Sequence, residues 1–217
     1  MKSLDKNQPP QNIVCFGDSL TEVKSDAEID RWPTRLHIAL EGWKPGRYKV
    51  YNRGLSGTST ADALEIIQNS VDQHLPALIL VAFGANDANV REYRKTARVG
   101  RREFEENLRE INRYISDRGG KCLFIAMHAP YRDPSIRTGN GKTSMENYRG
   151  HCLSIKQVGK ALRIPVFDMT LLLKRRKLTN KDVVCQDGIH LSTYGNHVYA
   201  SMIFDELKSL FEKGSPR

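Results

Sequence analysis

Short apolar runs alternate with amphipathic stretches along the whole chain. Residues 77–83 are apolar without interruption, which is typical of a strand that is covered on both faces of a sheet. A shorter run at residues 13–16 ends at Gly17, and residues 48–52 alternate between apolar and polar side chains. Together the runs predict five strands, at residues 13–16, 48–52, 77–83, 122–127 and 165–168.

Between these runs, apolar residues recur at spacings of three and four, as they do on one face of a helix. The clearest case is the helix predicted to end at Gly119-Gly120, where the repeat consists of Phe104, Leu108, Ile111 and Ile115. Further helices are predicted at residues 33–40, over about 60–71, and at 198–210 near the C-terminus. Ser59 or Thr60 can cap the second of these.

Strands that alternate with helices favour a parallel sheet with helices on both faces, joined by right-handed crossovers. We therefore expect an α/β protein with a three-layer, doubly wound, flavodoxin-like fold of about five parallel strands. Residues 11–213 are expected to form one domain, after a flexible N-terminal segment at residues 1–10. In this architecture ligands bind at the carboxyl ends of the strands, so residues that directly follow a strand are the candidates for function.

Composition limits the class of protein. Of the 217 residues, 39% are hydrophobic and 27% are charged, a balance typical of a folded domain rather than a disordered chain. No apolar run is long enough for a transmembrane helix, and the first residues do not resemble a signal peptide, so we expect a cytoplasmic protein. The four cysteines lie far apart in the sequence, which disfavours disulfides and a zinc site.

The chain carries a positive charge that could attract polyanions. Lys and Arg number 34 against 25 Asp and Glu, a formal net charge of +9. Such an excess attracts nucleic acid, anionic lipid or an acidic substrate. Four arginines follow the third strand closely and are expected near the mouth of a site at the sheet edge, where they would favour an anionic substrate or serve solubility alone: Arg91, Arg94, Arg98 and Arg102.

Polar residues that could take part in catalysis follow the strands. Gly17-Asp18-Ser19-Leu20 follows the first strand, a glycine-rich turn at residues 54–59 follows the second, and Gly84-Ala85-Asn86-Asp87 follows the third. Asp187-Gly188-Ile189-His190 precedes the last helix. A serine, an Asp/His pair and several hydrogen-bond donors at one sheet edge are what acyl transfer requires.

Each of these residues also has a structural interpretation. Ser19 could cap the next helix, and Asn86-Asp87 could form an Asx turn. His128 and His197 compete with His190 as a base, but Asp187 lies three positions before His190 and can orient its imidazole within one turn. Two other acidic residues, Asp18 and Asp87, are interpreted as side chains that hold the loops by accepting backbone hydrogen bonds.

The four blocks, in this order, resemble the GDSL, or SGNH, hydrolase family over residues 13–204. The resemblance implies that Ser19 is the nucleophile, His190 the base and Asp187 the residue that orients it. It also implies an oxyanion hole formed by the backbone N–H groups of Ser19 and Gly57 and by the side-chain amide of Asn86. No metal and no organic cofactor is implied. A Gly-x-Ser-x-Gly motif is absent, which disfavours the α/β-hydrolase fold.

The expected function is that of a serine hydrolase which cleaves carboxylic esters, with short-chain acyl or O-acetyl groups, through an acyl-enzyme. Its substrate would be a small-molecule or carbohydrate ester, with anionic esters among the candidates. The alternative is a non-catalytic, basic α/β protein that binds a polyanion such as nucleic acid. Nucleic acid is the less favoured partner, because the sequence has no basic stretch interleaved with aromatic residues. Nothing in the sequence specifies an oligomeric state.

Overall fold

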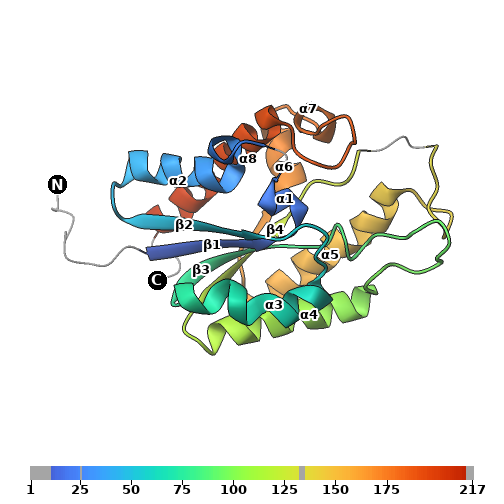
Figure 1. The fold of residues 1–217 in the computed structure, drawn as a ribbon, viewed down its shortest axis with the longest axis horizontal. Helices are drawn as coiled ribbons and strands as arrows, with labels where there is room; N and C mark the ends of the chain where they lie inside the picture. Colours follow the sequence, from blue (N-terminus) through green and yellow to red (C-terminus); the bar gives the residue numbers. More distant parts are fainter. Residues whose placement is uncertain (1–10, 25, 132–134, 214–217) are drawn as a thin grey trace.

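A five-stranded parallel sheet forms the middle layer of the protein (Figure 1). The computed structural model describes residues 11–24, 26–131 and 135–213, so the segment predicted to be flexible, 1–10, lies outside the described residues. The strand order is β2-β1-β3-β4-β5, the order of a flavodoxin-like sheet. The strands are β1 Gln11–Gly17, β2 Tyr48–Gly54, β3 Ala77–Ala82, β4 Lys121–Ala126 and β5 Val166–Asp168. The predicted fold class and all five strands are confirmed.

Helices cover both faces of this sheet, as Figure 1 shows. One face is covered by α2 Trp32–Trp43, α6 Met169–Arg175 and α8 Thr193–Glu212. The other is covered by α3 Thr60–Val71, α4 Arg101–Ser116 and α5 Ser144–Leu162. The remaining elements are short: α1 Ser19–Glu22, α7 Asn180–Val183, and the 3-10 turns Glu28–Asp30 and Asp72–His74. None of the described helices combines the length and apolar character that crossing a lipid bilayer requires.

The two faces of the sheet explain the uninterrupted apolar runs. Side chains of a strand alternate between faces, so Ile13 and Cys15 enter the core beneath α2 and α8, whereas Val14 and Phe16 enter the core beneath α3 and α4. All four are fully buried. Burying a large apolar side chain stabilises a fold by about 1.5–3 kcal/mol, so both layers contribute to holding the central strands.

One long helix is missing from the elements that the apolar pattern predicts. Helix α5 buries His151, Ser154 and Gly159 along with its apolar residues, so apolar side chains are too sparse to show its period. A capping box marks its start, since the hydroxyl of Thr143 accepts the N–H of Glu146 and the Glu146 carboxylate accepts the N–H of Thr143. That spacing is a readable N-terminal signal.

The strand order brings the segments after β1, β2 and β3 together. The end of β2 contacts α1 closely, because a Cβ on Gly54 would lie 2.2 Å from the backbone nitrogen of Glu22. Only glycine fits there. The turn that follows β2 is therefore pressed against the helix that follows β1.

Candidate active site

Ser19 opens the short helix α1 directly after β1. Asp18 caps this helix, and its Oδ1 accepts a hydrogen bond of 2.9 Å from the N–H of Leu20. The hydroxyl oxygen of Ser19 lies 3.0 Å from Nε2 of His190, although 171 positions separate the two residues in the sequence. This distance allows the imidazole to accept the hydroxyl proton.

A tight loop before α8 holds Asp187 and His190 together. Oδ2 of Asp187 lies 2.6 Å from Nδ1 of His190, and Oδ1 accepts the backbone N–H groups of Ile189 and His190 at 2.9 and 3.0 Å. Burial opposes ionisation of Asp187, but the hydrogen bonds from His190 and these N–H groups outweigh it and lower the pKa of the carboxyl. The Asp187 carboxylate is thus suited to keep the proton of His190 on Nδ1, which leaves Nε2 free to face Ser19.

His128, the competing histidine after β4, supports this loop from the protein interior. It is buried, with Nε2 2.7 Å from the carbonyl oxygen of Ile189 and Nδ1 2.6 Å from the hydroxyl of Tyr199. Burial lowers the pKa of His128 to about 4, so the ring is neutral at pH 7. Because a carbonyl only accepts, Nε2 carries the proton and Tyr199 donates to Nδ1. Sequence reasoning missed this supporting role, since 61 positions separate His128 from Ile189.

His197, the third candidate, lies in α8 and faces Asp30 at 3.1 Å. Among the described residues, His190 is therefore the histidine that lies within hydrogen-bonding distance of Ser19.

The glycine-rich turn after β2 brings further donors to Ser19. In the turn, the N–H of Thr58 donates to the carbonyl oxygen of Leu55 at 3.3 Å, and Gly57 has a φ of +79°. Within the described part of the chain, the N–H groups of Ser19 and Gly57 have no hydrogen-bond acceptor. Unpartnered N–H groups beside a nucleophile can bind an oxyanion.

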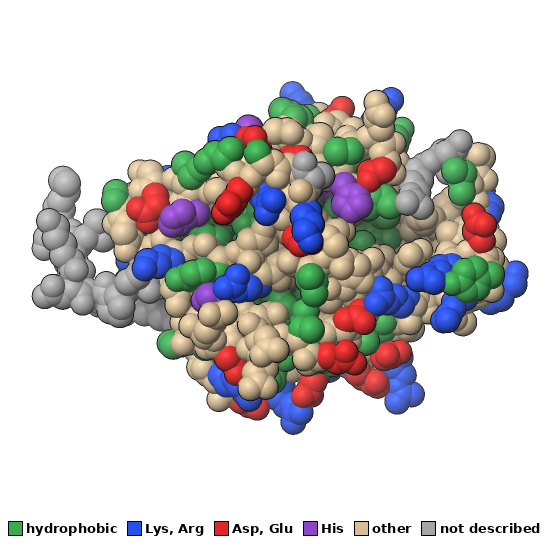
Figure 2. Space-filling view, in the orientation of Figure 1, with side chains coloured by type: hydrophobic (Ala, Val, Ile, Leu, Met, Phe, Trp, Pro, Cys, Tyr) green, Lys and Arg blue, Asp and Glu red, His purple; other side chains and the backbone are tan. Residues whose placement is uncertain are grey.

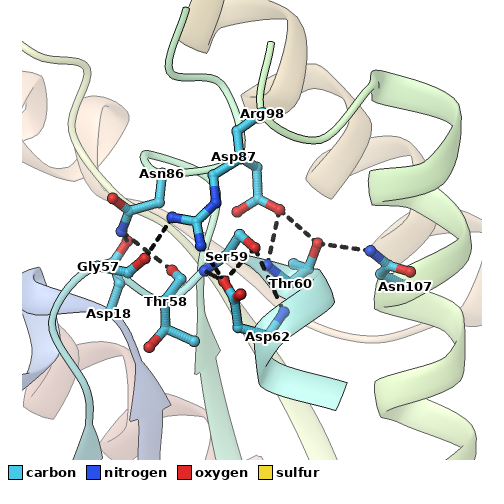
Figure 3. A network of polar contacts seen from close by, with 10 residues as sticks. All are labelled: Asp18, Gly57, Thr58, Ser59, Thr60, Asp62, Asn86, Asp87, Arg98 and Asn107. Carbon is cyan, nitrogen blue, oxygen red and sulfur yellow. Dashed lines mark hydrogen bonds and ion pairs between the residues drawn. The ribbon is translucent and has the colours of Figure 1, made fainter. Parts of the chain in front are cut away.

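Asn86 reaches the same turn from the loop after β3 (Figure 3). Its Nδ2 donates to the carbonyl oxygen of Thr58 at 3.1 Å and to Oδ2 of Asp18 at a longer 3.3 Å. The five residues singled out by sequence therefore lie in one place: Ser19, Gly57, Asn86, Asp187 and His190.

Two buried carboxyls organise the loops around Asn86. Burial, with a smaller contribution from nearby Asp87, raises the pKa of Asp18 to about 7. Asp87 accepts the N–H of Thr60 at 2.9 Å and the Thr60 hydroxyl at 2.5 Å, while Asn107 donates to that hydroxyl (Figure 3). Both carboxyls accept backbone N–H groups, as the sequence predicts.

Two cavities flank the Ser19–His190 pair. The larger, of about 430 Å³, extends past Asn86 and is walled by Val90, Pro130 and Tyr148. The smaller, of about 270 Å³, extends past Val23, Lys24, Cys185 and Leu191. A separate apolar cavity of about 300 Å³ at the other end of the sheet, lined by residues such as Pro76 and Phe211, has neither a serine nor a histidine in its walls. The candidate catalytic side chains therefore line the first two cavities.

Three of the four arginines expected near the mouth of the site contact neighbouring groups of the protein. Arg98 contacts the carbonyl oxygen of Gly57 and Oδ2 of Asp62, both at 2.6 Å. Arg102 is 93% exposed and pairs with Glu106 along α4, and Arg91 donates to the hydroxyl of Tyr93. Figure 2 shows Lys and Arg side chains gathered at the right-hand end of the molecule.

No group of three or more His, Cys, Asp or Glu side chains that could hold a metal ion occurs within residues 11–24, 26–131 and 135–213. The polar groups around Ser19 are instead arranged as hydrogen-bond donors and acceptors toward one another.

Comparison with known proteins decides the family. The sequence model of the GDSL-like Lipase/Acylhydrolase family matches residues 15–198. The chain belongs to this family. Its members are esterases and acylhydrolases, so the protein is an ester hydrolase by family.

Relatives with similar sequences carry esterase names, and solved structures share the fold. The chain is 25% identical over 213 residues to the isoamyl acetate-hydrolyzing esterase 1 homolog of Bos taurus, covering 93% of this chain and 81% of that protein. A lipase/acylhydrolase from Enterococcus faecalis has the same fold, with a TM-score of 0.74 at 23% identity over 92% of this chain and 96% of that one. An acetylxylan esterase from Geobacillus stearothermophilus aligns with a TM-score of 0.72 at 15% identity, over 91% and 94% of the two chains.

Proposed function

We propose that this GDSL-family hydrolase cleaves carboxylic esters through an acyl-enzyme on Ser19. The observation that carries the proposal is the continuous hydrogen-bonded chain from Ser19 through His190 to Asp187. It lies beside two N–H groups that have no acceptor among the described residues. A nucleophile, an oriented base and oxyanion donors form a complete set for acyl transfer.

In the first half-reaction, Oγ of Ser19 attacks the ester carbonyl carbon while Nε2 of His190 takes the hydroxyl proton. The tetrahedral oxyanion accepts hydrogen bonds from the N–H groups of Ser19 and Gly57 and from Nδ2 of Asn86. Asn86 can turn from its long contact with Asp18, because an oxyanion is a stronger acceptor. Collapse of the intermediate breaks the bond to the alcohol, which leaves with the proton from His190.

The second half-reaction uses the same groups. A water molecule attacks the acyl carbon of the acyl-enzyme, and His190 takes its proton. The oxyanion forms again in the same place, and collapse returns the proton to Oγ of Ser19 and releases the carboxylic acid. Asp187 stabilises the imidazolium that forms in each half.

The cavities support small esters as substrates. The two cavities of about 430 and 270 Å³ meet at Ser19 and His190, so the acyl and alcohol parts of one ester can lie on opposite sides of the reacting carbon. Two relatives carry names that specify acetate esters, namely isoamyl acetate and acetylxylan. We therefore infer a short-chain or O-acetyl ester of a small molecule or carbohydrate.

Hydrolysis of p-nitrophenyl acetate tests this function. The wild-type protein is expected to release p-nitrophenol catalytically, and Ser19→Ala is expected to lower kcat by at least about 10³-fold, as losses of a nucleophile do elsewhere. Ser116→Ala is a matched control, because Ser116 is exposed at the C-terminal end of α4. Equal rates for wild type and Ser19→Ala would contradict the proposal.

A further inference from the structure

The turn at residues 55–58 has two possible states, and only one of them presents the N–H of Gly57 as observed. Gly57 has a φ of +79°, and Ser56 is not among the described non-glycine residues whose φ is positive. This combination is that of a type II turn, in which only the third residue has a positive φ. Reversal of the central peptide between Ser56 and Gly57 converts such a turn to type I. Glycine permits both states, and the reversal sends the N–H to the opposite face.

Glu22 holds one side of this turn. Its Oε2 accepts the N–H of Ser56 at 2.8 Å and also the Ser56 hydroxyl. Burial opposes its ionisation, but these hydrogen bonds outweigh it and lower the pKa of the carboxyl, and only 14% of the side chain is exposed. Glu22 is the last residue of α1, the helix that begins with Ser19, so α1 connects the nucleophile to the turn.

Arg98 holds the other side, as Figure 3 shows. One guanidinium nitrogen donates to the carbonyl oxygen of Gly57, and a second donates to Oδ2 of Asp62. Asp62 is itself fixed, because its carboxylate accepts the N–H and the hydroxyl of Ser59 in the capping box of α3. Arg98 thus ties the turn to the start of a 12-residue helix.

We infer that Glu22 and Arg98 are positioning residues that hold the turn at the place where its Gly57 N–H faces the oxyanion. Their charge-assisted hydrogen bonds fix the peptide groups on the two sides of the central one, so the place of the Gly57 N–H relative to Ser19 depends on both contacts. The inference rests on the proposed function, since it assigns the Gly57 N–H to the oxyanion hole.

This role differs from electrostatic attraction of substrate by Arg98. Attraction would act on anionic esters alone and would weaken as salt screens the charge. A positioned donor acts in the transition state, so it lowers the barrier for neutral and anionic esters alike. The two roles therefore predict different substrate and salt dependences.

Arg98→Met is the first variant, measured on p-nitrophenyl acetate and on an anionic ester, with Arg102→Met as the control. We expect Arg98→Met to lower kcat about tenfold on both esters and at both low and high salt, with KM changed by less than about twofold. This is less than the roughly 10²–10³-fold cost of losing an oxyanion donor outright, because the turn still spends part of its time in the active state. Arg102→Met should leave kcat unchanged.

The double variant with Gly57→Ala separates positioning from a general structural effect. Apart from Ser56 and Thr58, no heavy atom of the described residues lies within 4 Å of a Cβ at Gly57, so alanine fits. The positive φ nevertheless disfavours alanine and shifts the turn away from the observed state. We expect Arg98→Met to add less than about twofold in the Gly57→Ala background, since both variants act on one donor. Arg98→Lys keeps the positive charge but loses the planar guanidinium that donates to two acceptors at once. Its kcat should lie between those of wild type and Arg98→Met.

The outcomes distinguish the inference from the function on which it rests. Absence of ester turnover by the wild type would overturn both. Wild-type turnover with Arg98→Met equal to Arg102→Met would overturn the positioning role alone, as would a full tenfold loss from Arg98→Met added to Gly57→Ala. Should Arg98→Met unfold, the same comparisons with Arg98→Lys and Glu22→Gln decide the question.

Discussion

At the scale of single residues, Asp18 is a carboxyl whose ionisation the fold alters strongly. It caps α1 beside Ser19, yet it is almost fully buried and faces the carboxyl of Asp87. These surroundings, burial first, raise its pKa to about 7. Asn86 contacts the same carboxyl, so the charge of Asp18 acts close to a proposed oxyanion donor.

The raised pKa of Asp18 makes stability depend on pH. Because the unfolded chain has a carboxyl pKa near 4, the folded protein binds this proton more tightly, and its contribution to stability is complete below about pH 4 and is lost as pH rises toward 7. The amide in Asp18→Asn does not titrate. The free energy of unfolding of wild type minus that of this variant should therefore fall between about pH 4 and pH 7, by at most about 1.4 kcal/mol per pH unit.

Urea unfolding of both proteins across this range measures the difference. A difference that stays constant or rises with pH would show that Asp18 is not held as an acid.

Residue chemistry could be predicted from the sequence where it is local, and not where it joins distant segments. Ser19, Gly57, Asn86, Asp187 and His190 stand out because each belongs to a short block after a strand or before a helix. The contacts of His128 with Ile189 and of Arg98 with Gly57 span 61 and 41 positions, and no local pattern marks them. The catalytic roles of the five residues stay predictions.

At the scale of elements, the loop that carries Asp187 and His190 depends on α8 and β4. Tyr199 of α8 donates to His128, which follows β4, and His128 donates to the carbonyl between the two proposed catalytic residues. The loop is also closed by the N–H of Cys185, which donates to the carbonyl oxygen of His190 at 2.7 Å. The loop that carries the proposed base is thus held by the buried His128 and by a backbone hydrogen bond.

Tyr199→Phe tests this support. Removing the hydroxyl leaves Nδ1 of the buried His128 without a donor, which should lower the free energy of unfolding by about 1–3 kcal/mol. It should also lower kcat with little change in KM, because His190 is less well placed for proton transfer. Tyr114→Phe is the control, since its hydroxyl contacts Asp72 at the far end of the molecule.

Chemical denaturation and steady-state kinetics on both variants give the comparison. Loss of stability in Tyr199→Phe with kcat equal to that of Tyr114→Phe would limit the Tyr199–His128 contact to folding.

Elements were predictable where one side of a helix or strand is purely apolar. Helix α4 buries Phe104, Leu108, Ile111 and Ile115, the residues that predict it. Helix α5 escapes the same reasoning because its buried side is mixed, with Tyr148 donating to the carbonyl oxygen of Met127 and His151 to that of Val99. Buried polar residues whose hydrogen bonds are made by distant segments cannot be distinguished from exposed ones by the hydrophobic pattern.

At the scale of the whole molecule, the strand order decides which segments meet. Because β1 lies between β2 and β3, the segments that carry Ser19, Gly57 and Asn86 emerge side by side at one sheet edge. The alternation of strands and helices predicts this architecture, and the structure confirms it. The direction of the arginine side chains could not be predicted, since it depends on which carbonyl or carboxylate a folded loop offers.

The central claim is that Ser19 is the nucleophile, and a covalent trap tests it most directly. A fluorophosphonate should add once to the wild-type protein, since Oγ of Ser19 displaces fluoride while His190 takes the proton. Peptide mass spectrometry should place the adduct on Ser19, and Ser19→Ala should not be labelled. An adduct on another serine, or labelling that persists in Ser19→Ala, would contradict the account.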